Sequence, residues 1–244
     1  MVRAMARALS IAIATCALGG AAFASPKSAA RRSHAQANNM PAGFTWPPSK
    51  AMVAAGKTCE AHLDELGIGW QAAKAQGHVV DPITLADFTL GGIKYTALYD
   101  KSGNSPTRSA AAGGAEVSDK HAPVMDCQLA LGLAQVGQVL FDLGVREVRF
   151  GSIYRWSKVR VGGKTKNMLS RHALGLAMDV VSFVDDTGRE AVVGKDYKAG
   201  DELLHAIERT IDATPGFRGV LTPQNDPISH KDHFHIEANP DYRN

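Results

Sequence analysis

Several features that would mark a specialised class of protein are rare in this sequence or missing from it. Only three cysteines occur in 244 residues and none forms a CxxC pair, so a zinc site built from thiolates is not indicated. The formal net charge of +3 gives no argument for nucleic acid or an anionic membrane as a partner. We find no internal repeat. The remaining composition, 45% hydrophobic and 21% charged, is typical of a soluble globular protein with a core.

The sequence also offers no convincing membrane span, which needs about 20 apolar residues. Its N-terminal apolar run, residues 8–22, is shorter than that and follows Arg3 and Arg7. Ala22-Phe23-Ala24 then fits the small-x-small cleavage pattern of secretory signals. We therefore expect 1–24 to be a signal peptide and the mature protein to be periplasmic or secreted, without stable membrane insertion.

Export changes the interpretation of the cysteines. Cys16 lies in the expected signal peptide, and Thr15 before it suits lipoprotein processing poorly. Cys59 and Cys127 remain as an even pair in an oxidising compartment. One disulfide that closes a long loop is favoured, and two buried free thiols are the alternative.

The composition divides the mature chain into a linker and one domain. Residues 25–48 are rich in Ala, Ser, Asn and Pro without periodicity, which is typical of a flexible linker. We expect a folded domain over 49–244. Within it, residues 101–118 form a Gly/Ser/Ala-rich loop, and loops of that length are usually functional or disordered.

Apolar residues at helical spacing predict helices over 51–66, 127–144 and 201–213, with Asp126 capping the second. Strand-like stretches lie between them. A hairpin is predicted over 79–99, a strand over 145–152 and another over 233–237. Because the elements do not alternate regularly, they indicate an α+β fold: a small, mainly antiparallel sheet flanked by helices.

Three of the nine histidines crowd into six positions, as His230, His233 and His235. If 233–237 is a strand, His233 and His235 lie on one face and Phe234 on the other. Two adjacent imidazoles suit a metal site or a proton-transfer site better than an apolar core. A solvated polar edge is the alternative.

A second polar pair, His172 and Asp179, lies in an otherwise small and apolar stretch. Catalytic zinc takes three imidazole or carboxylate ligands and keeps its fourth position for water. This pair and one histidine of the 233–235 segment supply such a set. HxxxxxxD alone is a weak motif, but it gains weight from the HxH pattern in an exported chain.

The motif Ser170-x-His172-x-x-Gly175-x-Ala177-x-Asp179 with downstream His233-x-His235 resembles the metallopeptidase group of lysostaphin, D-Ala-D-Ala peptidases and hedgehog domains. Within that group, the chain most resembles the extensin-like C-terminal domain family of bacteria. The supporting stretches are the two cysteines, GSIYRW, VGGKTKNMLSRHALGLAMDV and SHKDHFHIE. The similarity covers about residues 50–244 and implies a zinc peptidase fold.

The resemblance implies His172, Asp179 and His235 as ligands of Zn2+. His233 would lie beside the metal as a base or a stabiliser of the intermediate. Asp232 occupies the place where D-Ala-D-Ala dipeptidases carry a catalytic glutamate. Because an aspartate is shorter, we rank His233 ahead of Asp232, and the choice stays open.

Three further residues receive roles from the same resemblance. Arg155 would bind a substrate carboxylate or the developing oxyanion, with an exposed surface arginine as the alternative. Ser170 would shape the loop by a local hydrogen bond. His230 would either orient a ligand or lie exposed.

The function implied is an exported zinc-dependent peptidase that hydrolyses peptidoglycan stem peptides or cross-links, as a D,D- or L,D-endopeptidase or carboxypeptidase. A non-catalytic, zinc-containing module that binds the cell wall or a partner is the alternative. His233 beside three intact ligands favours the enzyme, because a structural site closes its fourth position with a protein ligand. A metal-storage or sensing role is disfavoured, because one mixed N/O site without thiolates suits neither.

Overall fold

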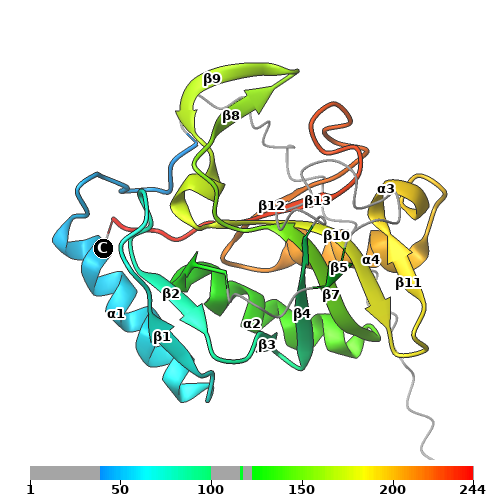
Figure 1. The fold of residues 1–244 in the computed structure, drawn as a ribbon, viewed down its shortest axis with the longest axis horizontal. Helices are drawn as coiled ribbons and strands as arrows, with labels where there is room; N and C mark the ends of the chain where they lie inside the picture. Colours follow the sequence, from blue (N-terminus) through cyan, green and yellow to red (C-terminus); the bar gives the residue numbers. More distant parts are fainter. Residues whose placement is uncertain (1–38, 100–115, 118–122, 244) are drawn as a thin grey trace, which may run out of the picture. The chain divides into compact units, whose positions relative to one another are not determined.

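The structure is a computed structural model that describes residues 39–99, 116–117 and 123–243. The expected signal peptide and most of the expected linker lie outside these residues, as does most of the 101–118 loop. Helices and mainly antiparallel strands confirm the α+β class (Figure 1). No helix in the described ranges is long and apolar enough to cross a membrane.

The described end of the expected linker, residues 39–48, makes specific contacts with the domain. The Asn39 side chain is buried, and its Nδ2 donates to the Leu169 carbonyl at 3.1 Å. Ala42 forms a parallel β-bridge with Asp241. The contacts of the domain therefore extend to Asn39, ahead of the start at 49 expected from composition.

The main sheet has eight strands among the described residues, in the order β12-β13-β10-β7-β4-β3, with β11 beside β10 and β5 beside β4. All neighbours are antiparallel except β4 and β7, which run parallel. The strands are β3 (Thr89–Leu90), β4 (Ile93–Tyr99), β5 (Glu116–Val117), β7 (Val145–Ser152), β10 (Ala177–Asp185), β11 (Glu190–Val192), β12 (Phe217–Leu221) and β13 (Phe234–Ala238).

Two smaller sheets accompany it. One is three-stranded, in the order β1-β2-β6. The other is a hairpin of β8 and β9 that extends away from the main sheet (Figure 1). Their strands are β1 (Trp70–Ala72), β2 (Pro82–Leu85), β6 (Met125–Asp126), β8 (Lys158–Val161) and β9 (Lys164–Leu169).

The hairpin predicted over 79–99 is only partly right. β3 and β4 do pair around Gly91 and Gly92, but β2 belongs to the three-stranded sheet. Gly91 has φ +58°, and a Cβ there would lie 2.6 Å from the Gln138 backbone nitrogen. Glycine is therefore required both by the turn and by the close approach of helix α2 (Cys127–Asp142).

The predicted helices form close to their expected bounds, and polar side chains cap them. Asp126 caps α2 by accepting from the Gln128 N–H at 3.0 Å, and Asp201 caps α4 by accepting from the Leu204 N–H at 3.0 Å. The helices are α1 (Lys50–Glu65), α2 (Cys127–Asp142), α3 (Val193–Asp196) and α4 (Glu202–Ala213), and a 3₁₀ turn, η2, spans Arg171–Leu174.

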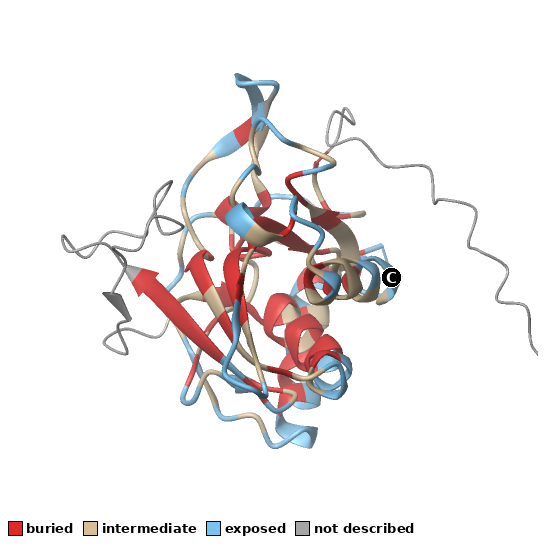
Figure 2. Cartoon of the chain, turned by 90° about the vertical axis from the view of Figure 1, so that its right-hand side faces the viewer, coloured by how far each residue is buried: buried red, intermediate tan, exposed pale blue. Residues whose placement is uncertain are grey.

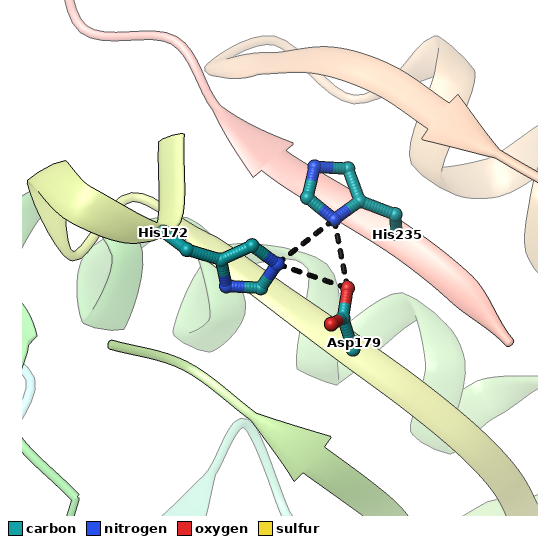
Figure 3. A group of neighbouring side chains, drawn as sticks. All are labelled: His172, Asp179 and His235. Carbon is teal, nitrogen blue, oxygen red and sulfur yellow. Dashed lines mark hydrogen bonds and ion pairs between the residues drawn. The ribbon is translucent and has the colours of Figure 1, made fainter. Parts of the chain in front are cut away.

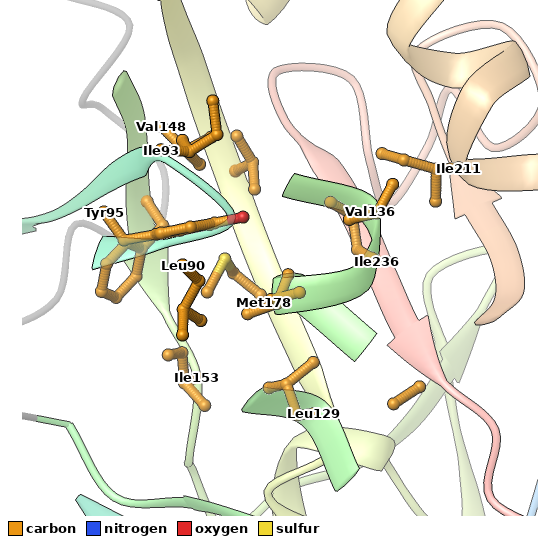
Figure 4. Close-up of a cluster of buried hydrophobic side chains, with 14 of the residues drawn as sticks. Leu90, Ile93, Tyr95, Leu129, Val136, Val148, Ile153, Met178, Ile211 and Ile236 are labelled. Atoms are coloured by element: carbon orange, nitrogen blue, oxygen red, sulfur yellow. The ribbon is translucent and has the colours of Figure 1, made fainter. Parts of the chain in front are cut away.

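The core lies between α2 and the main sheet. Leu129 and Val136 of α2 pack in one apolar cluster with Met178 of β10 and Ile236 of β13 (Figure 4). The buried residues concentrate on this helix and the strands beside it, whereas the β8–β9 hairpin is largely exposed (Figure 2). Apolar burial of this extent is the main stabilising term of the domain.

The predicted disulfide is present and joins α1 to the first residue of α2. Cys59 and Cys127 are 1% and 0% exposed, and the bond closes a sequence separation of 68 residues. It fixes α1 to the helix on which the sheet packs.

Candidate metal centre

Three side chains from two distant segments converge beside the start of β10 (Figure 3). His172 lies in η2, Asp179 in β10 and His235 in β13. His172 Nε2 is 3.0 Å from Asp179 Oδ1 and 3.1 Å from His235 Nδ1, and the last two atoms are 2.8 Å apart. The three residues are 0%, 7% and 4% exposed, respectively. Among the described residues, the three form a group able to hold a metal ion.

Strand register places two of these residues. Asp179 lies directly opposite His235 of β13 on one side and opposite Ser152 of β7 on the other. Directly opposite residues point to the same face of a sheet. The three side chains therefore lie on one face, although 27 and 56 positions separate Asp179 from Ser152 and His235.

The turn before β10 positions His172, the third residue of the cluster. Ser170 caps η2, and its Oγ accepts from the His172 N–H at 3.3 Å, as predicted. Gly175 ends the turn with φ +66°, and a Cβ there would lie 2.7 Å from the Asp126 nitrogen. The left-handed glycine lets the chain reverse so that His172 faces Asp179.

Hydrogen bonds on the far side of each ring fix the tautomers. His172 Nδ1 is 2.6 Å from the Ile153 carbonyl oxygen, which can only accept. His235 Nε2 is 3.0 Å from Glu237 Oε1, a carboxylate oxygen. Both of these ring atoms therefore donate, and in the neutral rings the lone pairs of His172 Nε2 and His235 Nδ1 point at the centre.

Asp179 is held in the same manner. Its Oδ2 accepts from Ser152 Oγ at 2.9 Å and pairs with Arg155 Nη2 at 3.1 Å, so Oδ1 faces the two rings. Three acceptors thus converge with no hydrogen between them when both rings are neutral. This arrangement is repulsive unless a cation, a metal ion or an added proton, occupies the centre.

The pKa values of all three groups differ from their ordinary values. Burial lowers the pKa of His172 to about 4, although Asp179 opposes the shift. Burial acts in the same direction on His235, but hydrogen bonds to Asp179 and Glu237 raise its pKa to about 9. For Asp179, burial favours the neutral acid, but the charges of His172 and Arg155 hold its pKa well below the ordinary value.

The donor set fits zinc. Two imidazole nitrogens and one carboxylate oxygen are ordinary zinc ligands, and tetrahedral coordination spaces neighbouring ligand atoms by about 3.3 Å. The observed 2.8–3.1 Å separations are shorter by a few tenths of an ångström. Small outward movements would therefore accommodate the ion, and the backbone and carboxylate partners of the rings already supply the outer hydrogen bonds that zinc sites use.

The side of the cluster open to solvent carries the predicted catalytic residues. His233 Nε2 lies 3.5 Å from Asp179 Oδ1, and its Nδ1 is 2.8 Å from Asp232 Oδ1. The side chains of His233 and Asp232 are 17% and 21% exposed, and that of Arg155 is 40% exposed. The hydrogen bond to His233, aided by the His233 charge, lowers the pKa of Asp232 although burial opposes it.

His230 lies among the other histidines rather than on an exposed edge. Its ring centroid is 5.1 Å from that of His233 and 5.0 Å from that of His235, and its side chain is 12% exposed. Nδ1 is 3.1 Å from Asp226 Oδ2. Burial lowers the pKa of His230 to about 4, so the ring is neutral at neutral pH.

The sequence interpretation missed the residues that hold the cluster from behind. Glu237, Ser152 and the Ile153 carbonyl each bond one of the three converging side chains. Glu237 had a readable signal, because it lies two positions after His235 in a strand and so on the same face. Its other carboxylate oxygen pairs with Arg218 Nη1 at 3.2 Å.

A buried arginine ties η2 to the end of β13. Arg171 is 2% exposed and donates to the Asn39 carbonyl at 2.8 Å, to the Ala238 carbonyl at 2.9 Å and to Asn239 Oδ1 at 3.0 Å. Because it precedes His172 and binds the backbone just beyond Glu237, it fixes the distance between the two halves of the cluster.

Residues 102–243 match the family described as extensin-like protein C-terminus. The chain belongs to this family. The match contains all three converging residues and the histidines beside them, whereas α1 and Cys59 precede it. No curated protein and no solved structure matches the chain.

Proposed function

We propose that this extensin-like protein is a zinc-dependent peptidase of the group that includes lysostaphin and D-Ala-D-Ala peptidases, and that it hydrolyses peptidoglycan stem peptides or their cross-links. The observation that carries the proposal is the convergence of the His172, Asp179 and His235 lone pairs beside a partly exposed His233. A zinc ion in such a site supplies Lewis-acid activation of water and of a peptide carbonyl.

His233 is the residue best placed to move a proton. Asp232 accepts the hydrogen of His233 Nδ1, which leaves the Nε2 lone pair on the side of Asp179 Oδ1, 3.5 Å away. A neutral imidazole oriented in this way accepts a proton from water and returns it to a leaving amine. We assign His233 as the general base and Asp232 as the residue that orients it.

Arg155 has two tasks in this proposal. Its Nη2 holds Asp179 Oδ2 at 3.1 Å, and its 40% exposed side chain borders the open side. The guanidinium presents five donors in a planar fork, so the pair with Asp179 uses only part of it. The exposed part would bind a carboxylate of the substrate peptide or stabilise negative charge on the carbonyl oxygen.

The expected signal peptide supports the choice of substrate. Peptidoglycan is a glycan polymer cross-linked by short peptides, and an exported bacterial protein meets it outside the cytoplasmic membrane. A periplasmic or secreted location is therefore part of the proposal, and separation of cell fractions with detection of the processed chain would test it.

Zinc content and the digestion of purified sacculi test the activity. The wild-type protein should contain one zinc ion and release peptide fragments whose masses identify the bond cleaved. His233→Ala should keep the zinc but lose about 10²–10⁴-fold in rate, as expected for loss of a general base. His172→Ala should lose both the zinc and the activity. His62 is an exposed residue of α1, and His62→Ala should keep both.

Two results would contradict the enzyme. One is a stoichiometric zinc content with no product from sacculi, which would favour the non-catalytic wall-binding module. The other is full activity of a metal-free His172→Ala protein.

A further inference from the structure

Two indoles and an imidazole form a solvent-exposed group that the proposed catalysis does not use. The ring centroids of Trp46 and His78 are 4.4 Å apart, and those of His78 and Trp156 are 5.1 Å apart. Trp46 is 45% exposed and Trp156 is 59% exposed. Three segments far apart in the sequence thus build one aromatic surface, called here the aromatic stack.

The aromatic stack is held in a defined position. Gly77 has φ +53° and lies so close to the Tyr154 hydroxyl and the Trp156 ring that a Cβ would overlap them. This contact fixes the loop that carries His78 against the segment that carries Trp156.

The stack is connected to the candidate metal centre through Arg155, the chain neighbour of Trp156. Trp156 follows Arg155, whose side chain pairs with Asp179 and whose N–H donates to the His172 carbonyl at 3.4 Å. Only one peptide unit therefore separates the stack from a residue that contacts the cluster.

A concentration of positive charge begins immediately after the stack. The β8–β9 hairpin carries four exposed basic residues, Lys158, Arg160, Lys164 and Lys166, called here the cationic hairpin. From 151 to 178 the sequence has six Lys or Arg residues and no Asp or Glu, although the whole chain has a net charge of only +3. The Ser170 N–H donates to the Ser157 carbonyl at 3.0 Å, which closes the base of the hairpin beside Trp156.

We propose that the aromatic stack and the cationic hairpin bind the amino-sugar backbone of peptidoglycan, which carries a free lactyl carboxylate wherever a stem peptide has been removed. The inference rests on the proposed function and extends it from the peptide to the glycan strand. The C–H face of a pyranose ring packs against the negative π face of an indole. The hairpin supplies charge complementary to the lactyl carboxylates of peptide-free stretches of the strand, an attraction that reaches about 8–10 Å at moderate salt.

The arrangement favours a polymer strand over a lipid surface. The tip of the hairpin, Gly162 to Thr165, is exposed and contains no aromatic or long apolar residue. Trp156 precedes the base of the hairpin in the sequence, and Trp46 is joined to Trp156 through His78. A membrane-binding element presents its apolar residues where the bilayer meets it first, which here would be the tip.

Glycan strands whose peptides have been removed by an amidase provide the probe. They keep one lactyl carboxylate per disaccharide and offer no peptide bond, so their binding does not depend on whether the protein is a peptidase. We would immobilise these strands and measure the affinity of the zinc-loaded protein over a range of salt concentrations. Trp156→Ala should bind about tenfold more weakly, as the loss of one well-packed aromatic contact predicts.

Lys164→Gln/Lys166→Gln should also bind more weakly and should show a smaller salt dependence. Lys195→Gln/Lys198→Gln removes two exposed charges at and after α3 and should bind as the wild type does. Trp70→Ala removes the third indole, which bonds Asp64 outside the stack, and it should retain glycan binding in its folded form. All four variants should keep the zinc content of the wild type.

Wild-type glycan affinity in both Trp156→Ala and the hairpin variant would overturn the proposal. So would stronger binding of anionic vesicles or of a single-stranded oligonucleotide than of glycan through the same residues. Glycan binding that needs these residues, with no cleavage of sacculi, would support this surface and contradict the peptidase. Cleavage of sacculi with unaltered glycan binding in the variants would support the peptidase and contradict the role of this surface.

Discussion

Glu237 Oε1 lies 3.0 Å from His235 Nε2, two residues back on the same strand, and so determines which nitrogen of that ring faces Asp179. Glu237→Ala should weaken zinc binding by about 10–100-fold, as for other outer hydrogen bonds of metal-binding histidines. Glu237→Gln keeps an acceptor for the ring and should lose less. Competition with a chromophoric chelator would measure both affinities.

The exposed Glu190→Gln on β11 is the matched control and should bind zinc normally. Glu237→Ala also leaves Arg218 buried without its carboxylate, so stability should fall by about 3–5 kcal/mol. An alanine variant with wild-type zinc affinity would show that Glu237 does not orient His235.

Zinc itself should stabilise the folded protein. A ligand that binds only the native state adds about 2.7 kcal/mol when its concentration is 100 times Kd. Urea unfolding with and without zinc would show this increase in wild type and in His62→Ala. His172→Ala should show none, and an equal increase in that variant would place the metal elsewhere.

Loss of the Cys59–Cys127 disulfide should destabilise the domain by about 2–4 kcal/mol, because the bond closes a long loop in the unfolded chain. Urea unfolding of wild type under reducing and non-reducing conditions measures the loss. The double variant Cys59→Ala/Cys127→Ala should be less stable and insensitive to the reductant. Sensitivity of that variant would mean that the reductant acts at another site.

Two carboxyls, one buried and one half-buried, should make stability fall as pH rises. Burial raises the pKa of Asp126 to about 7, and burial with the negative charge of Glu60 raises that of Asp81 to about 6. In the unfolded chain both lose their protons near pH 4. The stability that these protons give is therefore complete below about pH 4 and is lost as pH rises through 6 and 7.

Asp81→Asn isolates one of these contributions. The variant should gain stability relative to wild type as pH rises from about 4 to 6. The gain should be less than about 1.4 kcal/mol per pH unit, the value expected when the folded state binds one full proton more than the unfolded state. Asp126 is unsuitable for this test, because its carboxylate accepts from the backbone of Val80, Asp81 and Gln128. The exposed Asp87→Asn should leave the pH profile unchanged, and an unchanged profile in Asp81→Asn would contradict the prediction.

Gly175→Ala should damage both stability and zinc binding. The residue has φ +66° and lies against the Asp126 backbone, so a methyl group adds overlap to the cost of the left-handed conformation, together about 2–4 kcal/mol. Gly188 has φ +83° with no atom within 4 Å of its added Cβ. Gly188→Ala should therefore lose only about 1 kcal/mol and bind zinc normally. Equal losses in the two variants would mean that the contact with Asp126 is unimportant.

The sequence predicted what depends on local pattern. Asp126 and Asp201 are typical N-cap residues and so indicate where their helices begin. The α+β class follows from the mixture of elements. His172 and His235 could be paired because a motif, rather than geometry, connected them. The Cys59–Cys127 bond followed from the count of cysteines that remain after the expected export.

The parts that the sequence did not predict depend on contacts between distant segments. Nothing in the local pattern of Ser152 says that it will lie opposite Asp179, since that register is set by the packing of whole strands. The parallel pairing of β4 with β7 arises in the same way. The aromatic stack needs Trp46, a residue within the range expected to be a linker from its composition.

The closed base of the β8–β9 hairpin has a consequence for how such a protein can diverge. Because Ser157 and Ser170 already bond each other, the exposed residues at the tip of the hairpin can be exchanged, shortened or lengthened with little effect on Arg155 and His172 at either end. The surface of the hairpin can therefore diverge between related proteins while the candidate metal centre stays intact. The same property makes this hairpin a suitable position for inserting a foreign binding peptide into the domain.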